Sequence, residues 1–382
     1  MIVVPLVVAS LLVGTASLGD IRKLGRIGGK TVIFYMGTTA LAVTIGLLLS
    51  NIVEPGARVD AGTRDRLATE FGDEAAGQVA LATERPTLES FVLGLVPDNP
   101  VTAAAEGDLL PLIIFTIIFG AAISLVAGER KKAVLDFFNG VNDAVMVIID
   151  WVMKLAPYAV FALLAAVVAR FGFDLLGSLI VYSLTVIAGL ALHAFGTYAI
   201  LVRVLAKLNP LEFYRRIAKA PLVAFSTSSS NATLPVTMET AEEELGISKE
   251  VSSFVLPLGA TVNMDGTALY QAVATMFIAQ IYAVPMGITE QLTIVLTATL
   301  ASIGAAGVPS AGIIMLVMVL QSVGLGGQAA VGIALILGVD RILDMLRTAV
   351  NITGDLTAAS FIARSEGEAL VPHPVEHEIE LG

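Results

Sequence analysis

Cysteine is absent from this chain of 382 residues, and charged residues make up only 14 % of it. The first absence excludes disulfides, thiolate metal sites and cysteine nucleophiles. The second excludes an ordinary soluble domain, in which about a quarter of the residues are charged. Basic residues are also few, and the net charge of −11 argues against a nucleic-acid partner.

Hydrophobic residues fill the place of the missing charges, at 56 % of the chain. They gather into runs close to the roughly 20 residues that a helix needs to cross a bilayer. We therefore expect an all-α polytopic membrane protein. The expected spans are Met1–Leu18, Thr31–Val53, Leu109–Ala127, Val145–Val168, Leu175–Val202 and a run that begins near Val251.

Basic residues cluster in Arg22–Lys30, Arg130–Lys132 and Arg203–Lys219. The positive-inside rule makes these segments cytoplasmic, and the acid-rich segment Glu54–Pro86 an outside loop. Only three histidines are present, and His193 lies alone in an apolar run, where we expect plain packing.

The last apolar stretch, Val339–Asp355, carries five charges and an asparagine. At 100° per residue, Asp340, Asp344, Arg347, Asn351 and Asp355 fall within roughly 80° of arc. Each charge would cost about 2.5–3.5 kcal/mol at the centre of a membrane helix. We expect this stripe to face protein, water, ions or a polar ligand, and Arg341 beside it to pair with Asp340 or Asp344 or to reach toward water.

Two small polar segments interrupt the second half of the chain, Ser226–Asn231 and Ser302–Gly312. Each lies between apolar arms too short to span separately, which predicts two re-entrant helical hairpins. Gly259–Thr267 interrupts another apolar run between them. Irregular backbone at membrane depth is tolerated where it lines a cavity, and this twofold repeat is typical of a secondary transporter with its site at the repeat interface.

The serine-rich segment, Asn263-Met264-Asp265-Gly266-Thr267, the glycine-rich segment and the charged last helix occur in one order. With these motifs the chain resembles the glutamate transporter homologues, the sodium/dicarboxylate symporter family that includes archaeal aspartate transporters. The resemblance covers nearly the whole chain. It implies inverted repeats, a homotrimer, an elevator mechanism with the second hairpin as gate, and a multi-pass place in the cell's inner (cytoplasmic) membrane.

The resemblance also implies the domains. Residues 1–29 and 86–171 correspond to the scaffold and trimerisation part, with the family's first helix absent because Met1 aligns inside its second. Residues 30–54 and 172–365 correspond to the transport part, with hairpins at about 211–244 and 288–324. Residues 366–382 form a polar C-terminal tail.

The chemistry of the stripe suggests its ligands. With Asp265 added, the charges there sum to −2, so cations should enter first, and hard cations prefer oxygen ligands. Bound cations would then favour binding of an anion, and by thermodynamic linkage the bound anion would equally favour the cations. Arg347 offers a planar fork for a side-chain carboxylate, Asp344 can accept an α-ammonium, and Asn351 and Thr348 can bond the remaining groups. Hairpin-tip amides can cap a carboxylate, so we expect aspartate or glutamate as substrate.

By resemblance, the substrate residues are Ser230, Thr267, Val308, Gly312, Asp344, Arg347, Thr348 and Asn351. Two to three sodium ions would use three sets of residues. The first is Asp355, Asn351, Asn263 and the Gly259 carbonyl, the second is carbonyls near Thr261, Ser302 and Ile303 with Met264, and the third is Tyr35, Thr38, Thr39, Asn263 and Asp265.

Several alternatives stay open. Sodium-coupled relatives carry a carboxylate where Asp355 stands, whereas Gln271 replaces the glutamate of proton-coupled animal carriers. Ser228 and Met345 stand where relatives carry an additional arginine, so a C4-dicarboxylate or proton-coupled acidic amino acid symporter is the alternative. An anion channel is a further possibility. No histidine or lysine is placed to activate the serines, so we expect no enzyme.

Overall fold

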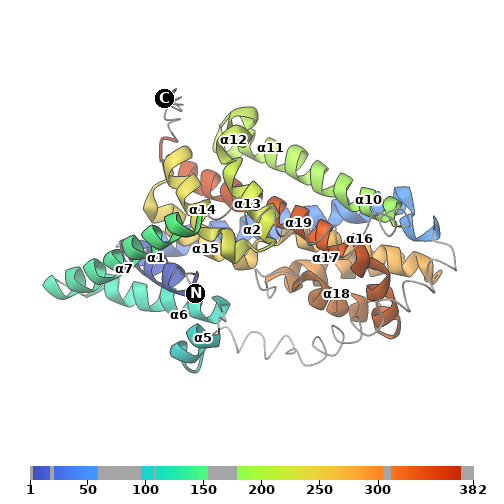
Figure 1. The fold of residues 1–382 in the computed structure, drawn as a ribbon, viewed down its shortest axis with the longest axis horizontal. Coiled ribbons are helices and arrows are strands. Elements are labelled where there is room, and N and C mark those ends of the chain that lie inside the picture. Colours follow the sequence, from blue (N-terminus) through green and yellow to red (C-terminus); the bar gives the residue numbers. More distant parts are fainter. Residues whose placement is uncertain are drawn as a thin grey trace.

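The computed structural model describes residues 3–17, 21–58, 96–106, 109–126, 128–153, 179–303 and 311–370. Helices and turns account for these ranges, in which no strand occurs, and the expected all-α class is confirmed (Figure 1). The helices of the first half are α1 (Val3–Ser17), α2 (Ile21–Val53), η1 (Pro55–Arg58), α5 (Pro100–Glu106), α6 (Leu109–Ser124) and α7 (Glu129–Met153).

One long rod opens the second half of the chain. It consists of α10 (Ile180–Ala191), the π-helical turn η2 (Leu192–Tyr198), α11 (Ala199–Leu201) and a second π-helical turn, η3 (Val202–Ala206). The helices that follow are α12 (Pro210–Ile217), α13 (Lys219–Thr227), α14 (Ser230–Glu239), η4 (Thr240–Glu244), α15 (Lys249–Val262), α16 (Asp265–Ile281), α17 (Ile288–Ile303), α18 (Ala311–Ser322), η5 (Gly326–Gln328) and α19 (Ala329–Ser365).

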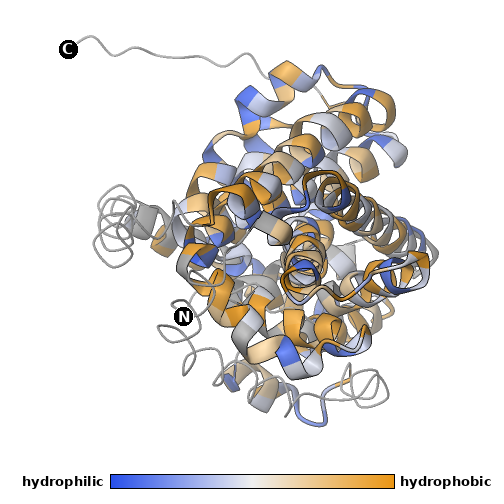
Figure 2. Ribbon diagram, turned by 90° about the vertical axis from the view of Figure 1, so that its right-hand side faces the viewer, coloured by the Kyte–Doolittle hydropathy of each residue, from blue (hydrophilic) through white to orange (hydrophobic). Residues whose placement is uncertain are grey.

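By length and composition, two helices of the described ranges could cross a membrane, Gly25–Ala57 and Ile180–Ala206. Figure 2 shows hydrophobic residues along most of the other helices as well. The expected spans at Met1–Leu18 and Leu109–Ala127 appear as α1 and α6, which are 15 and 16 residues long. Much of the expected span Val145–Val168 lies outside the described residues.

Helix α19 occupies the centre of the molecule (Figure 1). It contacts α10, α13, α14, α15, α16 and α18, while α16 also packs along α2. Helices α1, α6 and α7 form a group at one end, where α1 touches both of the others and reaches α14 and α15. The polar stripe of α19 is thus surrounded by the second half of the chain.

Two of the expected interruptions are present. Helix α15 ends at Val262 and α16 begins at Asp265, so the backbone leaves helical geometry at Asn263 and Met264. Helices α13 and α14 contact each other across a tight turn in which Ser228 is left-handed and the Ser229 hydroxyl caps α14. Helices α17 and α18 also contact each other, but the residues that join them lie outside the described ranges.

The C-terminal end of α19 is held by ion pairs at its surface. Arg26 and Lys30 of α2 contact the Glu366 carboxylate at 2.5 and 2.8 Å. These cations lower the pKa of Glu366 to about 2. Glu368 accepts hydrogen bonds from the backbone N–H and the hydroxyl of Ser248, at the start of α15. The end of α19 is thereby joined to two neighbouring helices.

Candidate functional site

The polar stripe of α19 lies inside the protein. Asp340, Asp344, Arg347, Asn351 and Asp355 are each 5 % exposed or less. A charge in such a place persists only where other groups compensate it. The expectation that this face points at protein or ligand, and not at lipid, is confirmed.

Arg347 is fully buried and lies between two carboxylates. Its Nη1 donates to Asp340 Oδ1 at 3.0 Å, and its Nη2 donates to Asp344 Oδ1 at 2.6 Å. The Tyr270 ring of α16 covers the guanidinium, with Cζ 3.8 Å from the ring centroid. Sequence reasoning assigned Asp344 and Arg347 to different parts of a substrate, whereas here they bind each other.

Arg341 approaches the same cluster from a more open position. Its Nη1 lies 3.9 Å from Asp344 Oδ2, and its side chain is 22 % exposed. Of the two expected pairings, the one with Asp344 is thus confirmed, while Asp340 is bonded to Arg347. The two arginines and two aspartates together carry no net charge.

A second polar cluster lies farther along the stripe. Asn263 Nδ2 donates to Asp355 Oδ1 at 2.8 Å and to the Asn351 carbonyl at 3.0 Å. The other oxygens, Asn263 Oδ1 and Asp355 Oδ2, are buried and have no hydrogen-bond partner among the described residues. Gly259 lies so close that a Cβ there would collide with Asp355 Oδ1 and with the Tyr35 hydroxyl. A buried oxygen without a donor is costly unless a ligand satisfies it, so this donor set fits a small hard cation.

Asn351 joins the helix break to α19. Its Oδ1 accepts from the Gly266 N–H at 2.8 Å, and its Nδ2 lies 3.3 Å from Met264 Sδ and 3.4 Å from Thr267 Oγ1. Thr348 is adjacent on α19, and its hydroxyl donates to the Asp344 carbonyl. Three of the sequence-predicted residues, Asn351, Met264 and Thr267, are therefore gathered at one point.

The start of α18 closes over Arg347. A Cβ on Gly312 would lie 2.9 Å from Thr267 Cγ2 and 3.5 Å from Arg347 Nη2, and the Gly312 carbonyl accepts from Gln271 Nε2 at 3.3 Å. The absence of a side chain at Gly312 therefore permits a close approach. Val308 lies outside the described residues, as do the side chains of Ser302 and Ile303.

Asp265, the first residue of α16, is fully buried and held by three donors from two other elements. Thr39 of α2 donates to Oδ1 at 2.5 Å, Tyr198 donates to Oδ2 at 2.7 Å, and His193 Nε2 lies 3.1 Å from Oδ2. The packing role expected for His193 is therefore wrong. His193 and Tyr198 are five residues apart in η2, and an i→i+5 turn brings such residues to one side where an α-helix would not.

Other predicted ligands already donate to backbone carbonyl groups. Thr38 and Thr261 each donate to a carbonyl three residues earlier in their own helix, and Tyr35 donates to the Val255 carbonyl at 3.1 Å. Their hydroxyl oxygens keep acceptor capacity in these arrangements. Ser230 is buried at the first position of α14, a helix that contacts α19.

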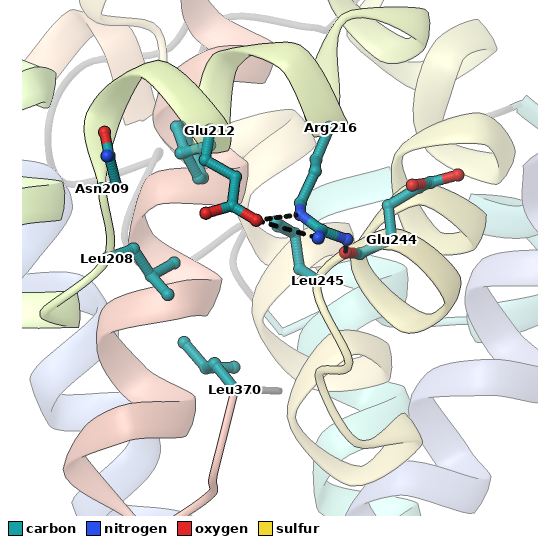
Figure 3. A pocket seen from close by; sticks show the side chains of 8 residues that line it. Leu208, Asn209, Glu212, Arg216, Glu244, Leu245 and Leu370 are labelled. Atoms are coloured by element: carbon teal, nitrogen blue, oxygen red, sulfur yellow. Dashed lines mark hydrogen bonds and ion pairs between the residues drawn. The ribbon is translucent and has the colours of Figure 1, made fainter. Parts of the chain in front are cut away.

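A small cavity of about 30 Å³ lies elsewhere, at the end of α12. Figure 3 shows Glu212 and Arg216 joined across one helical turn at its rim, with Leu370 opposite. Its lining shares no residue with the polar stripe. Within the described ranges, no three His, Asp or Glu side chains gather as a metal site. The cation fit at Asp355 therefore depends on carbonyl and amide oxygens around one carboxylate.

Comparison with known proteins follows the same motifs. The model of the sodium:dicarboxylate symporter family matches residues 1–365. The proton/sodium-glutamate symport protein of Bacillus caldotenax is 38 % identical over 96 % of this chain and 85 % of its own length. The proton/glutamate-aspartate symporter of Escherichia coli is 37 % identical over 96 % and 82 %, respectively. The C4-dicarboxylate transport protein of Bacillus subtilis is 34 % identical over 96 % and 85 %. This chain belongs to the sodium:dicarboxylate symporter family, a family of membrane transporters and not of enzymes.

Proposed function

We propose that this protein is a sodium-coupled symporter of aspartate and glutamate in the cell's inner membrane. The observation that carries the proposal is the contrast along α19. A buried arginine held by exchangeable carboxylates lies on the same helix as buried oxygens without donors. The first arrangement suits an amino acid with a second carboxylate, and the second suits a cation.

Substrate binding would proceed by exchange of partners. The side-chain carboxylate of the substrate takes the Arg347 Nη2 that now bonds Asp344, while Asp340 keeps Nη1 and holds the guanidinium in place. Asp344 then accepts the α-ammonium of the substrate. The remaining contacts are proposed for Ser230, Thr267, Val308, Gly312, Thr348 and Asn351, which surround the pair in the fold or in the sequence.

Sodium is the second cargo. Asp355, Asn263, Asn351 and the Gly259 carbonyl are proposed for one ion, because two of their oxygens await a ligand. Met264 with carbonyls near Thr261, Ser302 and Ile303 is proposed for another. A third would use Asp265 and Thr39, which are in contact, together with Tyr35, Thr38 and Asn263. A cation at Asp355 lowers the negative potential around the stripe and so favours the anion.

The coupling ion is the finer part of the proposal. The B. caldotenax relative is named a proton/sodium symporter, so a proton-coupled carrier is the alternative. The amide of Gln271 faces the Gly312 carbonyl where α18 meets α16, and an amide cannot carry a proton across at ordinary pH. This favours sodium alone. A C4-dicarboxylate carrier is the second alternative, because the B. subtilis relative bears that name.

The proposal extends to assembly and movement. The group formed by α1, α6 and α7 would belong to a scaffold, made of residues 1–29 and 86–171, that trimerises. Residues 30–54 and 172–365 would slide across the membrane as one body, carrying α13–α14 and α17–α18 as hairpins of two inverted repeats. In support, the helices around α19 come from this second set, and each helix pair is in mutual contact.

Uptake into proteoliposomes tests the function. Purified protein is reconstituted, and labelled aspartate is supplied under an inward sodium gradient, an inward proton gradient or no gradient. We expect concentrative uptake with sodium alone. Uptake driven only by protons would transfer the proposal to the proton-coupled alternative, and saturable conductance without accumulation would replace it with a channel. Competition by glutamate, succinate and serine ranks the substrates.

A further inference from the structure

We propose that Arg341 is a specificity-determining residue that lets the site accept dicarboxylates lacking an amino group. The inference rests on the proposed function and assigns a role to a residue outside the proposed binding set. It starts from the position of Asp344, whose two carboxylate oxygens face two different arginines.

The two arginines hold Asp344 in unequal ways. Arg347 is completely buried and contacts Asp344 Oδ1 at 2.6 Å. Arg341 is 22 % exposed, and its Nη1 lies 3.9 Å from Oδ2, about 1 Å beyond a charge-assisted hydrogen bond. A side chain at this distance, with part of its surface free, can close on Oδ2 without moving the helix. Arg341 can therefore become the counter-ion of Asp344 when a ligand takes Arg347.

Binding of an acidic amino acid does not require Arg341 to move closer to Asp344. The substrate carboxylate takes Arg347, and the substrate ammonium replaces Arg347 as the neighbour of Asp344. Asp344 keeps a positive charge beside it throughout. Arg341 stays at its longer distance, and it even competes weakly with the ammonium for the same carboxylate.

A plain dicarboxylate makes a different demand. It takes Arg347 in the same way but brings no cation, so Asp344 would stay negative next to a second anion. A buried carboxylate that loses its counter-charge is strongly disfavoured. Residues 304–310, which follow α17 in the sequence, include no charged residue. Arg341 can move in and restore neutrality, and it thereby determines how well such a substrate binds.

The test is a comparison of two ligands on three variants. Affinities for aspartate and for succinate are measured at saturating sodium in the purified protein, Arg341→Gln, Arg341→Lys and the exposed-charge control Arg215→Gln. We expect Arg341→Gln to weaken succinate about two- to fivefold more than aspartate, the loss expected when one partly exposed ion pair of up to about 1 kcal/mol is removed. Arg341→Lys should restore part of the ratio, and Arg215→Gln should leave it at the wild-type value.

Each result separates this inference from the function on which it rests. If the parent protein does not bind aspartate, the proposed function fails. If it binds aspartate but Arg341→Gln keeps the parent ratio or favours succinate, the role of Arg341 is overturned while the function stands. A parent protein that does not bind succinate at all also overturns the role. Thermal unfolding of every variant confirms that the ratio is measured on folded protein.

Discussion

The two ends of the polar stripe on α19 use the same residue types in opposite ways. Around Arg347, two carboxylates and two guanidinium groups pair with one another and their formal charges cancel, while Arg347 Nε has no hydrogen-bond partner among the described residues. Around Asp355, one carboxylate shares an amide donor, and two buried oxygens lack partners among the described residues. The Arg347 end of the stripe is balanced in charge, whereas at the Asp355 end two buried oxygens lack hydrogen-bond donors.

This difference separates two ways of binding a charged ligand. At the charge-balanced end, a ligand that bonds Arg347 Nη2 replaces an internal ion pair, so it must offer a matching charge, and this requirement favours selectivity. At the end that lacks donors, a cation is simply added, and its affinity follows from how many oxygens converge on it. The following predictions test this contrast, beginning with the largest expected effect.

Arg347→Cys should have the largest effect, because it removes the ion pairs at the charge-balanced end of the stripe. It leaves Asp340 and Asp344 as buried carboxylates without their guanidinium, which costs about 3–5 kcal/mol of stability. Affinity for aspartate should fall about 10- to 100-fold, because the charge-assisted hydrogen bond proposed between Arg347 Nη2 and the substrate carboxylate is lost. Binding isotherms and thermal unfolding measure both effects.

A second variant separates stability from recognition. Adding Asp340→Asn to Arg347→Cys removes one of the two stranded charges, and it should recover part of the stability but none of the aspartate affinity. Binding of neutral amino acids such as serine is measured on both. Aspartate affinity like that of the parent in Arg347→Cys would show that the guanidinium does not bind the substrate.

Asp355→Asn should weaken the end that lacks donors and leave the Arg347 cluster intact. Loss of the one carboxylate should raise the sodium concentration for half-maximal binding about tenfold or more. Apparent aspartate affinity should fall at low sodium and return at high sodium, because the two are linked. Sodium titrations at several aspartate concentrations measure this, with the exposed Asp136→Asn as control. Superimposed sodium titration curves for parent and variant would refute the assignment.

Tyr198→Phe should have a smaller effect on the same end. It removes the hydroxyl that donates to Asp265 Oδ2, a bond to a charged group worth about 1.5–3 kcal/mol. We expect a rise in the half-saturating sodium concentration of about three- to tenfold, with little change in the ratio of aspartate to succinate. Tyr214→Phe removes a hydroxyl bonded to the Ala194 carbonyl on the same rod and serves as control. Equal effects of the two variants would mean general loosening and no specific role.

Glu366→Gln should have the smallest effect, because Glu366 lies at the C-terminal end of α19 and belongs to neither end of the polar stripe. The pKa of Glu366 is lowered to about 2 by Arg26 and Lys30, so its stabilisation is present above the ordinary glutamate pKa of about 4.3 and is lost as the pH falls toward 2. At pH 7 the variant should unfold about 2 °C lower, as expected for a surface ion pair of up to about 1 kcal/mol. The difference in unfolding temperature between parent and variant should disappear below pH 3. A constant gap from pH 7 to pH 3 would contradict this.

Much of the central site could be predicted from the sequence, because its residues follow regular periods. The stripe on α19 follows the 3.6-residue repeat, and small polar residues marked the break at Asn263 and the turn at Ser228. The bonding of Arg347 to Asp340, seven residues earlier, was within reach of the same geometry. These features are local, so one helix is enough to reveal them.

The rest depends on contacts that no single helix encodes. His193 reaches Asp265 because a π-helical turn rotates it toward α16, and an α-helical period predicts a different face. Roles of Ser302, Ile303 and Val308 stay predictions, since those side chains lie outside the described residues.

Glycine contacts at the site have a mechanical consequence. Gly259 lies against Asp355, and Gly354 lies against Asn263 and Tyr198. A Cβ on Gly266 would lie 2.6 Å from the Arg347 carbonyl oxygen. The backbone of α15, α16 and α19 therefore lies directly against these neighbours, with no intervening side chain that could rotate to make room for an ion. We therefore expect a shift of these neighbours on ion binding to move the backbone of the helices as well.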